Sequence, residues 1–291
     1  FIPQMYQKLN LSREDVNKAL FLIIGGILKK AVISDYISLN FVDRVFDAPN
    51  SYTAFENWMA SYGYAIQIYC DFSGYSDMAI GIALLMGFKL SLNFRTPYKS
   101  GSITEFWRRW HISLSSWLRD YLYISLGGNR KGKFRTYINL FVTMLLGGLW
   151  HGASWKFVVW GTLHGSALVV ERLFKEYFKI PKNWFVRFIS VLITFHFVVF
   201  CWIFFRARDF ATAFEVIENI GKVQANFNQW WTIIQGYQNV FLVMLIGFVW
   251  HFLPQNLIQF LQDTFGKLPI VFKALVLAFV FWVVFATASS G

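Results

Sequence analysis

The sequence predicts an all-α integral membrane protein that crosses the bilayer several times. Hydrophobic residues make up 56% of the 291 residues and charged residues only 15%, whereas soluble domains are about 25% charged. The chain carries 27 Lys and Arg against 16 Asp and Glu, and a basic excess in so apolar a chain is typical of loops that face a membrane surface. We therefore expect membrane lipids, and not nucleic acid, beside these basic side chains, and exclude disordered, fibrous and ordinary soluble classes.

A membrane-spanning helix needs about 20 mostly apolar residues, and several stretches reach or approach this length. The first, residues 18–38, carries Lys29 and Lys30 in its middle, which suits an interfacial or short tilted helix whose lysines reach lipid head groups. The other candidates are residues 60–90, 137–150, 155–170, 185–205, 238–253 and 270–288. Because no repeat or low-complexity tract divides them, we expect one membrane-embedded domain over residues 1–291.

The stretches 137–150 and 155–170 are each short for a crossing. Together they predict a hairpin whose turn, WHGAS at residues 150–154, lies at membrane depth. The preceding segment, residues 89–135, is rich in Lys and Arg, and by the positive-inside tendency we expect it on the cytoplasmic side.

Within that basic segment, the spacing predicts one amphipathic helix over residues 103–126. Ser102 and Glu105 have capping-box spacing. Large apolar residues then recur at intervals of three and four, which draws one stripe along a helix: Trp107, Trp110, Leu114, Trp117 and Tyr121. Such a helix lies in the membrane interface or dips into the protein, with Arg119 on its flank, and the simpler alternative is a plain surface anchor.

Two histidines are candidates for chemistry. His151 lies at the turn of the expected hairpin between Trp150 and Gly152, where a neutral imidazole could act as a general base. His111 borders the aromatic stripe, and Ser115 lies one turn further along the same side. A structural histidine is the alternative at both positions, and it is the preferred interpretation for the three histidines inside apolar runs, His164, His196 and His251.

Two carboxylates interrupt the apolar run 60–90. Asp71 and Asp77 enclose Ser73, and a charged group in hydrocarbon costs about 2.5 to 3.5 kcal/mol on insertion scales. We therefore expect these residues to break the helix and to line an aqueous cavity or pair with an arginine of the basic segment. A proton or cation relay would use the same carboxylates, so residue types alone favour a transporter as much as an enzyme.

The chain carries no phosphate-binding glycine loop, nucleophile elbow, HExxH or CxxC motif. Its two cysteines, Cys70 and Cys201, lie in apolar runs without metal-type spacing, so no metal site is expected.

Two continuous stretches resemble a known family. Residues 71–130, from DFSGYSDMAIG to LGGNR, and residues 146–165, LGGLWHGASWKFVVWGTLHG, are similar to membrane-bound O-acyltransferases, in the bacterial branch with alginate O-acetyltransferase and the teichoic-acid D-alanyl transfer protein. The resemblance implies a core of transmembrane helices with re-entrant or interfacial amphipathic helices. It also implies further helices before residue 1, so we expect this chain to be a fragment.

The resemblance also implies a site. The family has its most characteristic histidine in a WHG context, here His151, and a second in a WxRWH context, here His111. These two are the expected catalytic pair, with side chains about 5 to 12 Å apart beside one tunnel. The residues expected to bind substrate or line the tunnel are Asp71, Ser73, Asp77, Trp110, Ser115, Arg119 and Trp150.

The implied reaction moves an acyl group, with acetyl expected, from a cytoplasmic thioester to a hydroxyl of an extracytoplasmic polysaccharide or of a partner protein. The donor is an acyl-coenzyme A or an acyl carrier protein, used as a substrate, and no cofactor is expected to be bound. A periplasmic acyltransferase and polysaccharide assembly proteins are the expected partners, in the inner membrane of a bacterium.

Two other classes stay open. A transporter or channel for acyl groups or ions would depend on Asp71 and Asp77 and would survive loss of His151. A structural scaffold would tolerate replacement of all of these residues.

Overall fold

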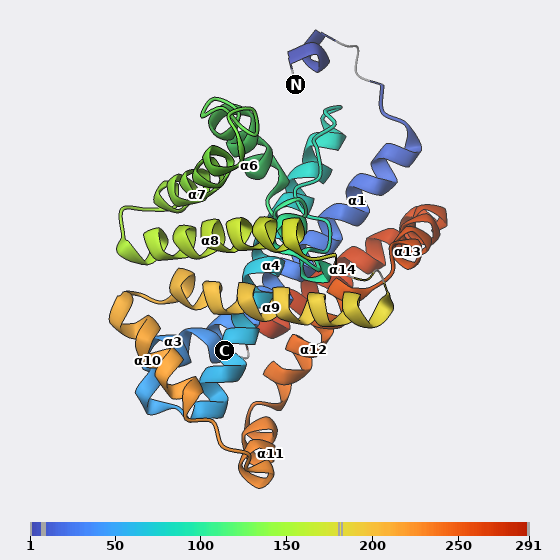
Figure 1. Ribbon diagram of the computed structural model, residues 1–291. Helices are drawn as coiled ribbons and strands as arrows, with labels where there is room; N and C mark the ends of the chain where they lie inside the picture. Colours follow the sequence, from blue (N-terminus) through green and yellow to red (C-terminus); the bar gives the residue numbers. More distant parts are fainter. Residues whose placement is uncertain (1, 7–9, 180, 182, 290–291) are drawn as a thin grey trace. The chain divides into compact units, whose positions relative to one another are not determined.

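The computed structural model describes residues 2–6, 10–179, 181 and 183–289. Within these ranges the chain is mainly helical and has no strand (Figure 1), which confirms the all-α prediction. The described residues form two compact units, the first from residues 1–44, 63–92 and 226–291 and the second from residues 45–62 and 93–225.

The first unit begins with a long helical segment that changes its winding. Helix α1 (Arg13–Ile27) starts at a capping box between Ser12 and Asp15. It continues without a break through a π-helical segment, Leu28–Ser34, into α2 (Asp35–Ile37) and a second π-helical segment, Ser38–Val42. Such wide turns are rare and are frequent at functional sites. The other helices of this unit are α11 (Phe227–Gly236), α12 (Gln238–Phe252), α13 (Gln255–Lys267) and α14 (Ile270–Ser289).

Helix α4 (Ala54–Leu85) contributes its second half to the first unit. It runs unbroken past Asp71 and Asp77, so the expected break at these carboxylates is wrong. Two glycines let the unbroken helix pack closely against α1. A Cβ on Gly74 would lie 2.7 Å from the carbonyl oxygen of Gly26, and a Cβ on Gly26 would lie 2.6 Å from that of Gly74. This close approach brings the middle of α4 against the end of α1.

The second unit is built around the expected hairpin. Helices α7 (Lys133–Trp150) and α8 (Trp155–Tyr177) pack against each other over most of their length (Figure 1), and α9 (Trp184–Arg206) packs on α8. The hairpin prediction, with its turn at residues 150–154, is confirmed. The remaining helices of this unit are α3 (Asp43–Asp47), α5 (Ile103–Trp107), α6 (Ile112–Trp117), α10 (Phe210–Gly221) and the start of α4.

Glycines set the separation of α7 and α8. A Cβ on Gly148 would lie 2.3 Å from the carbonyl oxygen of Phe157, and a Cβ on Gly161 would lie 2.5 Å from that of Met144. Real Cβ atoms do not approach backbone oxygens so closely, so only glycine permits this packing.

We therefore expect Gly148→Ala to force the hairpin apart and to lower the thermal unfolding temperature of the detergent-solubilised protein by several degrees, because a loss of about 1 to 3 kcal/mol is typical of overpacking. Gly221→Ala is the matched control, since nothing lies within 4 Å of a Cβ at that position of α10. An equal shift in both variants would contradict the packing argument.

The expected single helix over residues 103–126 is wrong. It is divided into α5, α6 and a π-helical segment, Leu118–Tyr123. The division falls at His111, whose φ of 44° and ψ of 56° are left-handed and cannot continue a right-handed helix. The predicted cap is present, because the Ser102 side chain accepts from the Glu105 backbone N–H.

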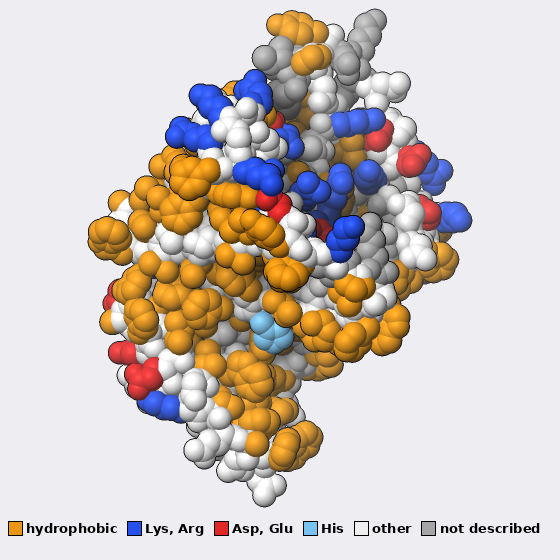
Figure 2. Space-filling model, viewed as in Figure 1, with side chains coloured by type: hydrophobic (Ala, Val, Ile, Leu, Met, Phe, Trp, Pro, Cys, Tyr) orange, Lys and Arg blue, Asp and Glu red, His pale blue; other side chains and the backbone are white. Residues whose placement is uncertain are grey.

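Fewer helices qualify as membrane spans than expected. Among the described residues, α9 and the Ile270–Thr287 part of α14 are long and apolar enough to cross a bilayer, with mean hydropathies of 2.4 and 2.5. Helices α11 and α12, bent by 90° at their junction, qualify together as one broken span. Hydrophobic side chains cover much of the visible surface over α7 and α8, whereas Lys and Arg gather near α6 (Figure 2).

Candidate active site

His151 lies where the α7–α8 turn begins. It caps the C-terminus of α7, and Gly152 follows with a φ of 153°, which lets the chain reverse toward α8. The imidazole is half-buried and lies in a ring of aromatic side chains. Its centroid is 5.1 Å from those of Trp150 and Phe205, 5.2 Å from that of Trp160 and 6.2 Å from that of Phe157.

The aromatic side chains around His151 favour the neutral form of its imidazole. Burial lowers the pKa of His151 below the usual range of histidine. In the part of the chain that the structure describes, no hydrogen bond occupies its ring nitrogens, so one of them remains able to accept a proton from a substrate.

His111 is held in a strained conformation between α5 and α6. A non-glycine residue at positive φ costs of order 1 to 3 kcal/mol and persists only where its surroundings impose it. Here Asn93 imposes it: its carbonyl accepts from the Ile112 N–H at 3.0 Å, and its Oδ1 lies 3.2 Å from His111 Nδ1. Ser113 Oγ lies 3.3 Å from the same nitrogen. Burial lowers the pKa of His111 to about 4, so this imidazole is neutral as well.

Both histidines belong to the second unit. A positive charge on His151 would lower the pKa of His111 further than burial alone. Their separation of about 5 to 12 Å stays a prediction.

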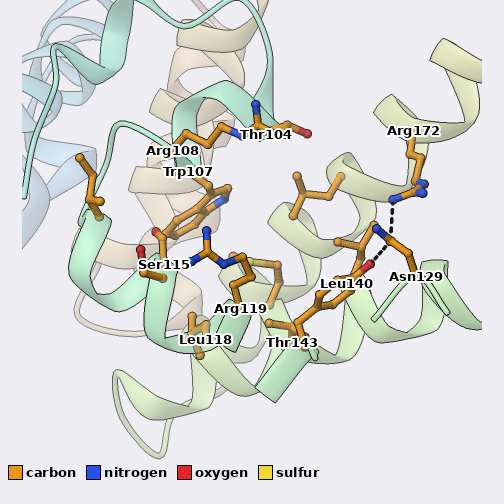
Figure 3. A pocket seen from close by; sticks show the side chains of 15 residues that line it. Thr104, Trp107, Arg108, Ser115, Leu118, Arg119, Asn129, Leu140, Thr143 and Arg172 are labelled. Carbon is orange, nitrogen blue, oxygen red and sulfur yellow. Dashed lines mark hydrogen bonds between the residues drawn. The ribbon is translucent and has the colours of Figure 1, made fainter. Parts of the chain in front are cut away.

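A cavity of about 390 Å³ lies in the same unit, between the α5–α6 region and helices α7 and α8 (Figure 3). Among the described residues, its wall carries three arginines, Arg108, Arg119 and Arg172, and no acidic residue. Ser115 and Arg119 are the expected tunnel-lining residues that lie on it. The full lining is Thr104, Trp107, Arg108, Ile112, Ser115, Ser116, Leu118, Arg119, Tyr123, Asn129, Leu140, Thr143, Met144, Leu168 and Arg172.

The other expected residues of this unit lie elsewhere. Trp110 is 4% exposed and packs in a dense aromatic cluster with Phe106 and Trp202, away from the cavity wall. Trp150 is 63% exposed and covers one side of the His151 ring. Neither His111 nor His151 is on the cavity wall.

Asp71, Ser73 and Asp77 lie in the first unit, whereas both candidate histidines lie in the second. Asp77 pairs with Lys29 at 2.6 Å, and Asp71 pairs with Lys30 at 2.6 Å. The expected pairing with an arginine of the basic segment is therefore wrong. Lys29 is largely buried and held by Asp77 of α4, so the expectation that it reaches lipid head groups is wrong, whereas the partly exposed Lys30 pairs with both Asp35 and Asp71. Ser73 is buried.

Two residues that contact the candidate histidines, Asn93 and Trp160, were not predicted from the sequence. Asn93 carries no motif, and its role follows only from a loop contact 18 residues away in sequence. Trp160 lies six residues after the WHGAS turn, and this closeness in sequence to His151 is a signal that could have been used. His164, expected to be structural, is fully buried one turn later in α8.

A family model described as the membrane-bound O-acyltransferase family matches residues 3–214. The chain belongs to this family. It is 44% identical over 226 residues to a peptidoglycan O-acetyltransferase of Helicobacter pylori, which covers 75% of this chain and 42% of that protein. It is 50% identical over 196 residues to a probable alginate O-acetylase AlgI of Pseudomonas aeruginosa, covering 66% of this chain and 36% of that protein.

A more distant relative is a teichoic acid D-alanyltransferase of Bacillus subtilis, 32% identical over 199 residues, with 65% of this chain and 50% of that protein covered. The matches therefore span about half or less of the length of these relatives. The first two are named for O-acetylation, of peptidoglycan and of alginate, and the third for D-alanylation of teichoic acid.

Proposed function

We propose that this chain carries the catalytic part of a membrane O-acyltransferase that moves a short acyl group, acetyl in the first instance, from a thioester to a hydroxyl. The observation that carries the proposal is the pair of neutral, half-buried histidines in one unit of a chain from this family. The acceptor is a polysaccharide outside the cytoplasmic membrane of a bacterium, or a periplasmic partner protein that passes the acyl group to it, in line with the names of the relatives.

In this mechanism His151 acts as general base. It takes the proton of the acceptor hydroxyl as the hydroxyl oxygen bonds to the acyl carbon, and the electron pair of the carbonyl bond moves to the carbonyl oxygen. The carbon–sulfur bond then breaks, the carbonyl re-forms, and His151 returns the proton to the departing thiolate. His111, fixed by Asn93, orients the acceptor. Aromatic rings around His151 keep out water that would hydrolyse the thioester.

The cavity supplies a site for the anionic part of the donor. Asp120 already pairs with Arg119 at 2.7 Å. The guanidinium groups of Arg108 and Arg172 favour phosphate, which coenzyme A and the prosthetic group of acyl carrier proteins both carry. Arg172 Nη1 donates to Asn129 Oδ1 at 3.2 Å, whereas the Arg108 side chain makes no hydrogen bond or ion pair within the described residues. The ion pairs of Asp71 and Asp77 with lysines count against the transporter, which would need these carboxylates available.

The proposal is tested with everted membrane vesicles that contain the protein and are supplied with radiolabelled acetyl-coenzyme A, by measuring acetyl esters formed on the envelope polymer. We expect Arg108→Gln and Arg172→Gln each to raise the KM for the donor about tenfold, because a hydrogen bond to a charged group contributes about 1.5 to 3 kcal/mol. Little change in kcat is expected.

Arg130→Gln is the matched control, since Arg130 is exposed and not on the cavity wall. An equal rise in KM in all three variants would indicate a general charge effect and contradict a donor site in the cavity. Vesicles that accumulate acetyl groups without forming esters would support the transporter instead.

A further inference from the structure

One cluster of polar atoms in the second unit has no role in the mechanism above. The indole nitrogens of Trp107, Trp160 and Trp202 and both ring nitrogens of His164 are buried without a hydrogen-bond partner among the residues that the structure describes. These side chains are between 0% and 9% exposed. A buried polar group that makes no hydrogen bond costs about 1 to 3 kcal/mol, so a set of them in one place calls for an explanation.

Trp160 is the centre of this cluster. Its ring centroid is 4.8 Å from that of His164, 5.7 Å from that of Trp107 and 6.0 Å from that of Trp202. Trp160 is also the member of the cluster that contacts His151, edge-on at 86° with the centroids 5.2 Å apart.

The cluster also reaches the cavity. Trp107 lines the cavity wall (Figure 3) and is in edge-on ring contact with Trp160. Trp160 is therefore in ring contact both with Trp107, a residue of the cavity wall, and with His151.

Acyl transfer needs a hydrogen-bond donor beside the carbonyl oxygen of the acyl group. Negative charge develops on the carbonyl oxygen as the hydroxyl attacks, and donors fixed in a water-free site stabilise it far more than they would in water. A donor that lacks a partner in the resting protein and gains one as the charge develops binds the transition state more strongly than the ground state. Indole N–H is a donor only, and it cannot compete with His151 for the proton.

We propose that the indole N–H of Trp160 is a further catalytic group, which donates to the carbonyl oxygen of the acyl group as negative charge develops on it. This inference rests on the proposed acyl transfer at His151. The donor keeps its proton throughout, so the balance of the reaction is that given above.

The test uses the vesicle assay with acetyl-coenzyme A and compares two substitutions that remove one buried indole N–H each. We expect Trp160→Phe to lower kcat about 10² to 10³-fold, the usual effect of losing one such donor, with the KM for acetyl-coenzyme A nearly unchanged. Trp202→Phe, which removes an equally buried indole that does not contact His151, should retain kcat close to that of the wild type.

Loss of ring volume is separated from loss of the donor by replacing Trp160 with β-(3-benzothienyl)alanine, which keeps the bicyclic shape and has sulfur in place of N–H. The same fall in kcat is expected, at a thermal unfolding temperature equal to that of the wild type. A kcat above about a tenth of wild type in this variant, or an equal fall in Trp202→Phe, would overturn the proposal. The wild type and His151→Ala report separately on acyl transfer itself: absence of ester formation by the wild type would overturn the proposed function, and an active His151→Ala would remove His151 from the mechanism.

Discussion

His151→Ala should abolish acyl transfer while leaving the protein folded. Loss of a general base lowers a rate by about 10² to 10⁴, and His151 is half-buried at a turn, where its side chain makes ring contacts but no hydrogen bond within the described residues. The measurement is the rate of acetyl ester formation in vesicles, normalised to the amount of the protein in the membrane.

His196→Ala is the matched control for that experiment. His196 also lies among aromatic rings, with Tyr62 and Phe195 at 5.7 and 5.6 Å, but its Nδ1 is 2.7 Å from the carbonyl oxygen of Leu192 in its own helix. It should retain activity. Activity of His151→Ala above a tenth of wild type at a normal protein level would remove His151 from the mechanism.

Asp77→Leu should destabilise the first unit strongly, by about 3 to 5 kcal/mol, because it leaves the charge of Lys29 buried without its partner. The two side chains are 11% and 21% exposed, and Lys29 lies 5.9 Å from the ring centroids of Tyr69 and Trp250. Thermal unfolding and SDS titration of the detergent-solubilised protein measure the loss.

Two further variants make this result specific. Asp71→Leu removes the pair with Lys30, whose side chains are 48% and 43% exposed, so it should cost only about 0 to 1 kcal/mol. Replacing both partners, with Lys29→Met beside Asp77→Leu, should restore most of the stability because no unpaired charge remains. Failure of the double replacement to recover would mean that the ion pair itself, and not the avoidance of an unpaired charge, stabilises the unit.

The features that sequence could predict are those decided within one segment. The hairpin α7–α8 follows from two short apolar runs on either side of WHGAS, and its prediction is confirmed. The resemblance of this region to the membrane-bound O-acyltransferases is confirmed by the family model, which matches residues 3–214. Ser102 caps its helix as the local spacing indicated.

Features that depend on contacts between residues far apart in the chain could not be predicted from the sequence. The aromatic stripe has helical periodicity through residue 111, yet the hydrogen bonds of Asn93 hold His111 at positive φ and end the helix there. Likewise, the run 60–90 gives no sign that its carboxylates pair with lysines some 40 or more residues earlier, with Lys29 and Asp77 48 positions apart. Periodicity reports which face of a helix is apolar, but it does not report which charge lies opposite.

The strained backbone at His111 bears on how this protein could be engineered. A glycine at this position would adopt the left-handed conformation at no steric cost, and an asparagine would adopt it more readily than most residues. Directed evolution that scores only heat resistance would therefore drift away from histidine here and would lose turnover while it gained stability. Residue 111 should be held fixed in any such library.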